Sequence, residues 1–109
     1  MRTLRFIVNG NTIKPDPNCD FSGLFPGREP HVNAEFEFSK EWQSCIKVVG
    51  FWSMLDAEYT PQQLEDGFSC MIPTEALERP AFKMQVFGGR KGINLQTNKI
   101  VILQAGGKK

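Results

Sequence analysis

The sequence predicts an all-β protein, an antiparallel β-sandwich of about seven short strands with one single-turn helix near residues 74–78. Short apolar or alternating segments recur along the chain, turn signals separate them roughly every eight to twelve residues, and one segment alone begins like a helix. The 109 residues are 40% apolar and 23% charged, which is typical of a soluble globular domain. We expect a single domain over residues 1–104 and a flexible tail over residues 105–109.

The first two expected strands form a hairpin that leads into a long loop. Residues 4–8 are mostly apolar, and Asn9-Gly10 favours a type I′ turn because both residues tolerate a positive φ. A short return strand should therefore cover residues 12–14. Residues 15–30 contain four prolines and two glycines, so they cannot hold a regular element. A loop of this length in a small domain either has a functional role or packs as a lid.

The middle of the chain supplies the next strands. Residues 31–38 alternate strictly, with Val32, Ala34, Phe36 and Phe38 on one face. Residues 45–52 are apolar on both faces, which predicts a central strand or one that is covered on both sides. We then expect a short strand over residues 59–63, a turn over residues 65–67 and a further strand over residues 68–72.

Residues 73–77 contain the one convincing helix start. Thr74 can cap the helix, Glu75 and Glu78 suit its positive end, and Pro80 stops it.

The last elements follow Pro80. Residues 81–87 alternate, with Phe82, Met84 and Val86 on one face. Residues 88–92 read GGRKG and are interpreted as a hairpin turn, because they lack both the GxxxxGK[ST] pattern and a following helix. Residues 93–103 supply one or two final strands.

Charge and cysteine usage narrow the class of protein. Thirteen Lys and Arg against twelve Asp and Glu give a net charge of +1, which argues against a sequence-specific nucleic-acid binder and against a DNA mimic. Cys19, Cys45 and Cys70 lack CxxC spacing, which favours reduced, buried thiols, although one disulfide with a spare thiol is the alternative. The N-terminus lacks signal-peptide features, and no apolar run reaches membrane-spanning length, so we expect no secretion by a signal peptide and no membrane partner.

The residues give no catalytic or metal-binding pattern. The one histidine, His31, lies on the polar face of a strand, and no base accompanies a nucleophile at a recognisable spacing. A zinc site would need four ligands with characteristic spacing. We therefore expect a non-enzymatic protein without catalytic residues, metal or cofactor.

Binding chemistry remains. Arg28, Arg90 and Lys91 stand in loops beside glycines and are candidate anion-binding residues. Trp52, Met54 and Tyr59 cluster near the end of an expected strand, where a cation beside an aromatic ring could hold a planar or anionic ligand. The alternative is that these residues are core aromatics and solvated turn charges.

A set of framework motifs covers most of the chain, from about residue 32 to residue 103. It comprises FEFSKEWQSCIKVVGFWS, then Tyr59, then LEDGFSCMIPTEALERPAFKMQVFGG, then LQTNKIVI. This pattern resembles the N-terminal β-sandwich of baseplate upper proteins and related tail components of phages and prophages of Gram-positive bacteria. The resemblance implies that Phe36 and Phe38 are core residues and that Trp42 closes one end of the sandwich. It also implies a location in the host bacterial cytoplasm or in the virion.

Three functional hypotheses follow. The first is a phage structural or adaptor protein that binds another protein, such as a baseplate component or a second copy of itself, through an exposed strand edge and the loop over residues 15–30. The loop residues expected to contact the partner are Phe21, Leu24, Phe25 and Arg28.

The second hypothesis is a phage-encoded inhibitor of bacterial immunity. It would act either as an anti-CRISPR that binds a host defence protein or as a sponge that sequesters a nucleotide second messenger. The sponge would place Arg28, Arg90 or Lys91 on phosphates. The third hypothesis is a carbohydrate-binding module that uses Trp42, Trp52 and Tyr59.

Overall fold

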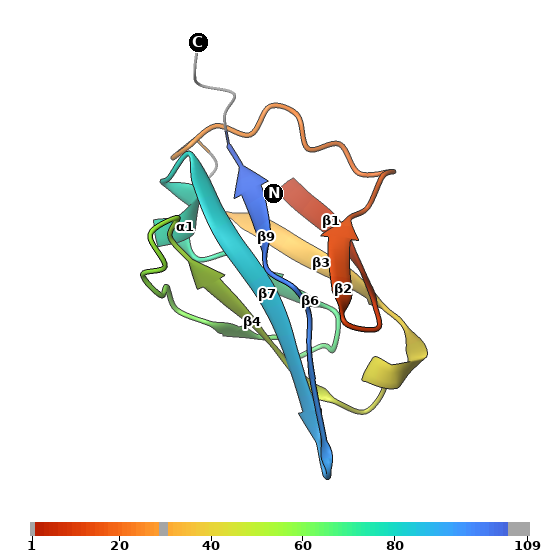
Figure 1. The fold of residues 1–109 in the computed structure, drawn as a ribbon. Helices are drawn as coiled ribbons and strands as arrows, with labels where there is room; N and C mark the ends of the chain where they lie inside the picture. Colours follow the sequence, from red (N-terminus) through yellow and green to blue (C-terminus); the bar gives the residue numbers. More distant parts are fainter. Residues whose placement is uncertain (1, 29–30, 105–109) are drawn as a thin grey trace.

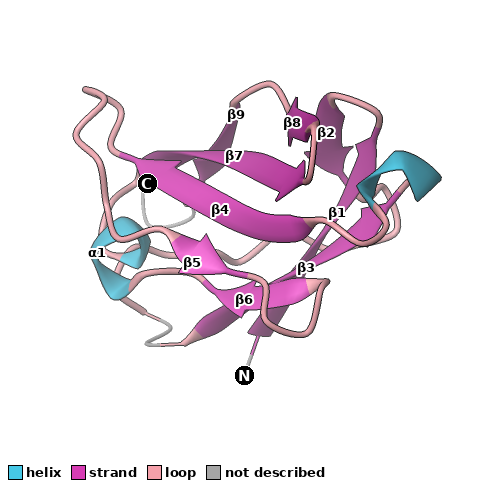
Figure 2. Cartoon of the chain, turned by 90° about the horizontal axis from the view of Figure 1, so that it is seen from below, coloured by secondary structure: helices cyan, strands magenta, loops and turns pink. Residues whose placement is uncertain are grey.

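The structure, a computed structural model, describes residues 2–28 and 31–104, so the expected tail over residues 105–109 lies outside the described residues. Two β-sheets pack face to face (Figure 1). The four-stranded sheet has the order β2-β1-β3-β6, and the five-stranded sheet has the order β5-β4-β7-β8, with β9 also paired to β7. Figure 2 shows the two layers from below. The predicted all-β sandwich is confirmed.

The described residues form nine strands and two short helical turns, more strands than the sequence predicts. The strands are β1 (Arg2–Asn9), β2 (Thr12–Pro15), β3 (Val32–Phe38), β4 (Ile46–Trp52), β5 (Gln62–Gln63), β6 (Ser69–Met71), β7 (Ala81–Arg90), β8 (Ile93–Gln96) and β9 (Ile100–Leu103). The turns are η1 (Lys40–Trp42), a 3₁₀ turn, and α1 (Thr74–Leu77).

The strands pair antiparallel with one exception, a parallel pair for which the sequence has no signal. β1 and β3 run parallel, with Arg2 opposite Val32 and Val8 opposite Phe38. Parallel neighbours need a crossover connection. The chain first returns along β2. The segment between β2 and β3 then crosses the end of the sandwich where β1 begins, so that β3 starts beside the start of β1 (Figure 1).

The core forms where the alternating faces of both sheets meet. In the four-stranded sheet, Phe6 of β1 stacks on Phe36 of β3 with ring centroids 5.5 Å apart. In the five-stranded sheet, Phe82 of β7 packs against Phe51 of β4. Period-two burial therefore builds the interior as the sequence predicts. The largest fully buried side chains are Trp42, Phe6, Phe51, Phe82, Leu4, Ile13, Met84, Val8, Val32, Val49 and Val86.

Trp42 closes one end of this core from η1. Its side chain is fully buried, and its indole N–H donates a hydrogen bond to the Gly10 carbonyl at 2.8 Å. A Cβ atom on Gly88 would come within 2.6 Å of the Trp42 ring. The indole thus lies between the β1–β2 turn and β7.

The predicted turn over residues 88–92 begins too early, because Gly88 and Gly89 belong to β7. β7 continues through Gly88 and Gly89 to Arg90, and the turn consists of Lys91 and Gly92, where Gly92 has φ +78°. Gly88 is part of a strand because Trp42 occupies the space that a side chain would need. A glycine pair next to charged residues resembles a turn in sequence, and packing is what distinguishes the two cases.

Three smaller predictions are confirmed in part or need correction. Thr74 does not cap α1: Pro73 occupies the cap position, and no side chain caps that end. β4 is a central strand between β5 and β7, which confirms one of the two predicted alternatives, but it is not covered on both sides, because Ile46 is 66% exposed. Cys45 and Cys70 are buried as expected, whereas Cys19 is half-buried, and all three are free thiols.

A polar seam joins the two sheets at one side. The Ile13 amide of β2 donates to the Asn98 side-chain oxygen at 2.9 Å, and the Asn98 amide donates to the Asn11 carbonyl at 3.2 Å. The corner between β8 and β9 therefore bonds to a backbone amide of β2 and to a carbonyl of the β1–β2 turn. Within the described range, no helix is long and apolar enough to cross a membrane.

Candidate functional site

The long loop, where the sequence places the partner contacts, packs as a lid over the core. Leu24 is only 3% exposed, and Phe21 lies edge-on against Phe6 with ring centroids 5.6 Å apart. Phe25 is half-buried, and the guanidinium of exposed Arg28 lies 4.7 Å from its ring centroid. The prediction that Leu24 contacts a partner is therefore wrong, because its side chain belongs to the core.

The backbone of the lid is fixed as well. The Arg2 guanidinium donates to the carbonyls of Asp20 and Ser22, at 2.8 and 2.6 Å. The Gly27 amide donates to the Leu77 carbonyl at the end of α1, at 2.8 Å. These bonds hold the lid at both ends.

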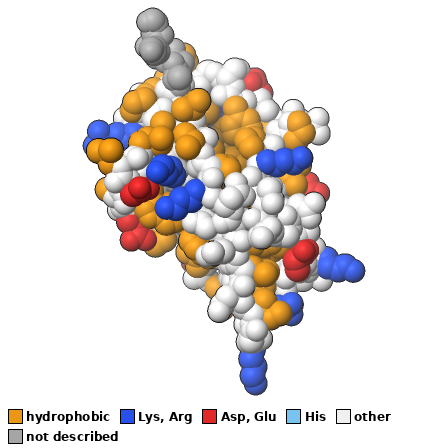
Figure 3. Space-filling view, viewed as in Figure 1, with side chains coloured by type: hydrophobic (Ala, Val, Ile, Leu, Met, Phe, Trp, Pro, Cys, Tyr) orange, Lys and Arg blue, Asp and Glu red, His pale blue; other side chains and the backbone are white. Residues whose placement is uncertain are grey.

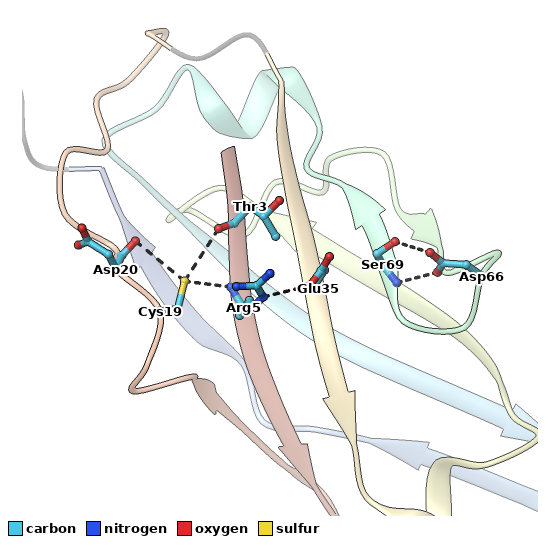
Figure 4. Close-up of polar contacts among 7 residues, drawn as sticks. All are labelled: Thr3, Arg5, Cys19, Asp20, Glu35, Asp66 and Ser69. Atoms are coloured by element: carbon cyan, nitrogen blue, oxygen red, sulfur yellow. Dashed lines mark hydrogen bonds and ion pairs between the residues drawn. The ribbon is translucent and has the colours of Figure 1, made fainter. Parts of the chain in front are cut away.

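Figure 4 shows how the lid meets β1. The Arg5 amide donates to Cys19 Sγ at 3.3 Å, and the thiol lies 3.9 Å from the carbonyls of Thr3 and Asp20. The Arg5 side chain forms an ion pair with Glu35 of β3 at 3.1 Å. The edge of β1 beyond β2 is therefore occupied by the lid, which bonds to the Arg5 amide through Cys19 and to the Arg5 carbonyl through the Asp16 amide.

The three candidate anion-binding residues do not meet within one chain. Arg28 lies in the lid at one end of the sandwich, whereas Arg90 and Lys91 lie at the tip of the β7–β8 hairpin at the other end (Figure 1). All three side chains are exposed. A single chain thus offers no joint phosphate site built from them.

An apolar pocket lies at the end of the five-stranded sheet. It has a volume of about 410 Å³ and is formed by the segment after β4 and by the connection from α1 to β7. Its lining residues are Ser53, Met54, Leu55, Ala57, Tyr59, Arg79, Pro80 and Ala81. Two of the three residues that the sequence groups together, Met54 and Tyr59, line this pocket; Trp52 does not.

The segment that forms one wall of the pocket is a tightly bonded turn. The Ser53 hydroxyl accepts hydrogen bonds from the amides of Leu55 and Ala57, at 3.2 and 3.0 Å, and the Ser53 amide donates to the Ala57 carbonyl. Asp56 adopts φ +67°, a conformation that L-residues rarely take. At the apex of this ordered turn, the Leu55 side chain is 93% exposed.

A charge cluster holds the turn against the sheet. The Asp56 carboxylate lies 2.8 Å from the Lys83 ammonium and 3.9 Å from that of Lys99. The hydrogen bond from Lys83 holds the pKa of Asp56 below its ordinary value, and the nearby positive charges act in the same direction. The Lys99 ammonium also lies 4.3 Å from the centroid of the Trp52 ring. Trp52 is thus part of a cation–π contact rather than of the pocket.

The pocket wall continues onto β9. Ala81 lines the pocket and pairs across the strands with Leu103. Leu103 is 63% exposed and Val101 is 47% exposed, both on the outer side of the sheet. We call Met54, Leu55, Val101 and Leu103 the apolar patch. Figure 3 shows hydrophobic side chains gathered over the upper part of this face, beside basic and acidic ones.

Sequence reasoning missed Leu55, Val101 and Leu103 as functional candidates. One signal was present: Met54 and Leu55 are consecutive apolar residues inside a turn that contains aspartate. For Val101 and Leu103, the apolar sequence of β9 predicts a strand but does not say which side lacks a covering layer.

No group of three His, Cys, Asp or Glu side chains that could hold a metal ion occurs among residues 2–28 and 31–104. Comparisons of the chain with protein-family models, curated proteins and solved structures gave no match. The resemblance to phage tail modules therefore stays a prediction that rests on the sequence motifs.

Proposed function

We propose that the protein is a non-enzymatic binding module that acts through protein–protein contacts, and that its binding surface is the apolar patch with the adjoining pocket. The partner that the sequence motifs favour is another component of a phage tail or baseplate. The proposed interface is therefore the outer side of the five-stranded sheet, and not the lid.

The observation that carries this proposal is the exposure of Leu55 at the apex of an ordered turn. A leucine that is 93% exposed gains nothing from folding by itself, yet the Ser53 bonds and the Asp56 ion pair fix its position. Single exposed apolar residues are common on monomers, but a pocket that continues into two further exposed aliphatic side chains is typical of an interaction surface.

The charges around the patch support the same function. Lys83 and Lys99 share one carboxylate, that of Asp56, so the rim of the patch is polar and locally positive. An apolar centre with a polar rim is the usual anatomy of a protein interface. An acidic group on the partner would complement this rim.

The test is capture of the partner from lysates of phage-producing cells by wild-type protein and by two matched variants. Leu55→Lys places a charge in the centre of the patch and should abolish capture. Phe68→Lys changes another large apolar side chain, 49% exposed, in the turn that precedes β6 of the other sheet, and should leave capture unchanged. Retained capture by a folded Leu55→Lys variant would refute the proposed surface.

A further inference from the structure

We propose that two copies of this chain pair through the free edge of β9, in antiparallel register with Ile102 opposite Ile102 of the second copy. The pairing joins the two five-stranded sheets into one continuous sheet. It rests on the proposed function in one respect, because it names a second copy as a protein partner, bound through the strand that carries Val101 and Leu103 of the apolar patch.

The alternation of hydrogen bonds along β9 identifies the groups that are free. Gln104 pairs with Pro80, and its amide donates to the Pro80 carbonyl at 2.7 Å. In an antiparallel ladder such pairs alternate, so Ile102 and Ile100 also direct their backbone groups toward β7. The N–H and C=O groups of Val101 and Leu103 therefore point away from the sheet. No described residue pairs with them on that side.

The other edges of the two sheets are shorter or occupied in the described part of the chain. On β2, the Ile13 amide is bonded to the Asn98 side chain. On the outer edge of β6, the Asp66 carboxylate accepts a hydrogen bond from the Ser69 amide at 2.8 Å. β5 has two residues, and β8 presents the polar side chains Asn94 and Gln96. β9 has neither a charge nor a proline within Ile100–Leu103, the devices that usually protect an edge strand.

The same residues make the edge complementary to itself. With Ile102 opposite its copy, Val101 of one chain faces Leu103 of the other, twice by symmetry, and each pair exchanges two backbone hydrogen bonds. Aliphatic side chains then stand opposite aliphatic side chains on the outer side, where such cross-strand pairs stabilise a sheet. No like charges stand opposite one another within the paired segments, because Ile100–Leu103 contains no charged residue.

Sedimentation equilibrium of the purified chain over about 1 µM to 1 mM tests the proposal. We expect the mass to rise with concentration from 12.3 kDa to twice that value and no further, because each copy has one such edge. A mass of 12.3 kDa throughout, or growth beyond two copies, would overturn it.

Two variants and a hydrogen-exchange measurement locate the contact. Val101→Lys places two lysines beside the pairing and should weaken the dimer about tenfold or more. Ile46→Lys changes a side chain on the same outer face in β4, which is flanked by β5 and β7, and should leave the dimer intact. Dimer loss in Ile46→Lys but not in Val101→Lys would overturn the proposal. The amides of Val101 and Leu103 should exchange more slowly as the concentration rises, and constant fast exchange in a dimer would also overturn it.

These outcomes separate the two proposals. A chain that stays monomeric but loses a foreign partner through Leu55→Lys refutes the pairing and supports the proposed function. A β9-paired dimer whose capture of other proteins is insensitive to Leu55→Lys supports the pairing and refutes the role of the pocket.

Discussion

Replacing Gly88 by alanine should destabilise the sandwich by about 1–3 kcal/mol, the usual cost of overpacking a well-filled core. The added methyl group would lie 2.6 Å from Cζ3 and 2.7 Å from Cε3 of Trp42, which is closer than real Cβ contacts. The indole cannot move aside easily, since it is fully buried and its N–H is bonded to Gly10. Gly88 has no positive φ, so the cost is steric and not conformational.

The neighbouring Gly89 provides the matched control. A Cβ there would meet its nearest atom, Asn94 Oδ1, at 3.6 Å, which is an ordinary contact. Gly89→Ala should therefore be neutral, or stabilising by up to about 1 kcal/mol, because alanine restricts the unfolded chain. Urea unfolding followed by circular dichroism measures both free energies, and thermal unfolding should show Tm differences of about 4 °C per kcal/mol.

A third variant tests the cause. Trp42→Phe removes the benzo ring that Gly88→Ala would strike, so Gly88→Ala should cost less in that background, with a coupling energy of at least about 0.5 kcal/mol. Equal stability of the Gly88→Ala and Gly89→Ala proteins, or strict additivity with Trp42→Phe, would refute the view that Trp42 closes the core against β7.

Three further predictions concern polar and thiol groups. Gln104→Ala should cost about 1–3 kcal/mol in urea unfolding, because the buried side chain donates to two carbonyls at the end of α1, each at 2.8 Å; a change below about 0.5 kcal/mol would contradict this. The Ser69 hydroxyl and nearby amides lower the pKa of Asp66 from 3.8. The free energy of unfolding of wild type should therefore exceed that of Ser69→Ala by its full amount above pH 3.8, and this difference should shrink as the pH falls below 3.8. A difference that is independent of pH would argue against this bond. Burial raises the pKa of the Cys70 thiol to about 12. At pH 8 a thiol reagent should therefore label half-buried Cys19 and leave Cys70 unmodified until the protein unfolds. Equal labelling of both thiols in the native protein would contradict the burial of Cys70.

Local patterns in the sequence predict much of this fold. The alternation around Phe36 and Phe82 identifies β3 and β7 because one side of each strand faces the core, and period two is visible without any partner strand. The hairpin that joins β1 and β2 is predicted in the same way, but the expected type I′ turn at Asn9 and Gly10 is wrong. Asn9 belongs to β1 and pairs with Thr12, so the turn consists of Gly10 and Asn11, with a positive φ of +61° at Gly10 and not at Asn11.

Features that depend on distant contacts were not predictable. The parallel pairing of β1 with β3 has no local signal, since it arises from the path of the crossover over the sandwich end. Gly88 resembles a turn residue until Trp42 is placed beside it. Leu24, in a loop rich in proline, resembles an exposed contact residue until the loop is seen to cover the core.

The candidate site was predicted even less well, for a related reason. Hydrophobic side chains such as Leu55 and Leu103 look the same in sequence whether they face a core or solvent. Only the arrangement of the two layers shows that one face of the five-stranded sheet has no described cover. Met54 and Tyr59 were grouped together because they are close in sequence, and the pocket confirms that proximity.

Residue-resolved hydrogen exchange, recorded while the protein concentration is raised, tests most directly whether the β9 side of the sandwich engages another polypeptide. Slowing at the Val101 and Leu103 amides, with the Ser69 and Met71 amides of β6 unchanged, is the predicted result. Protection that appears at β6 and spares β9, or exchange that ignores concentration throughout, would contradict it.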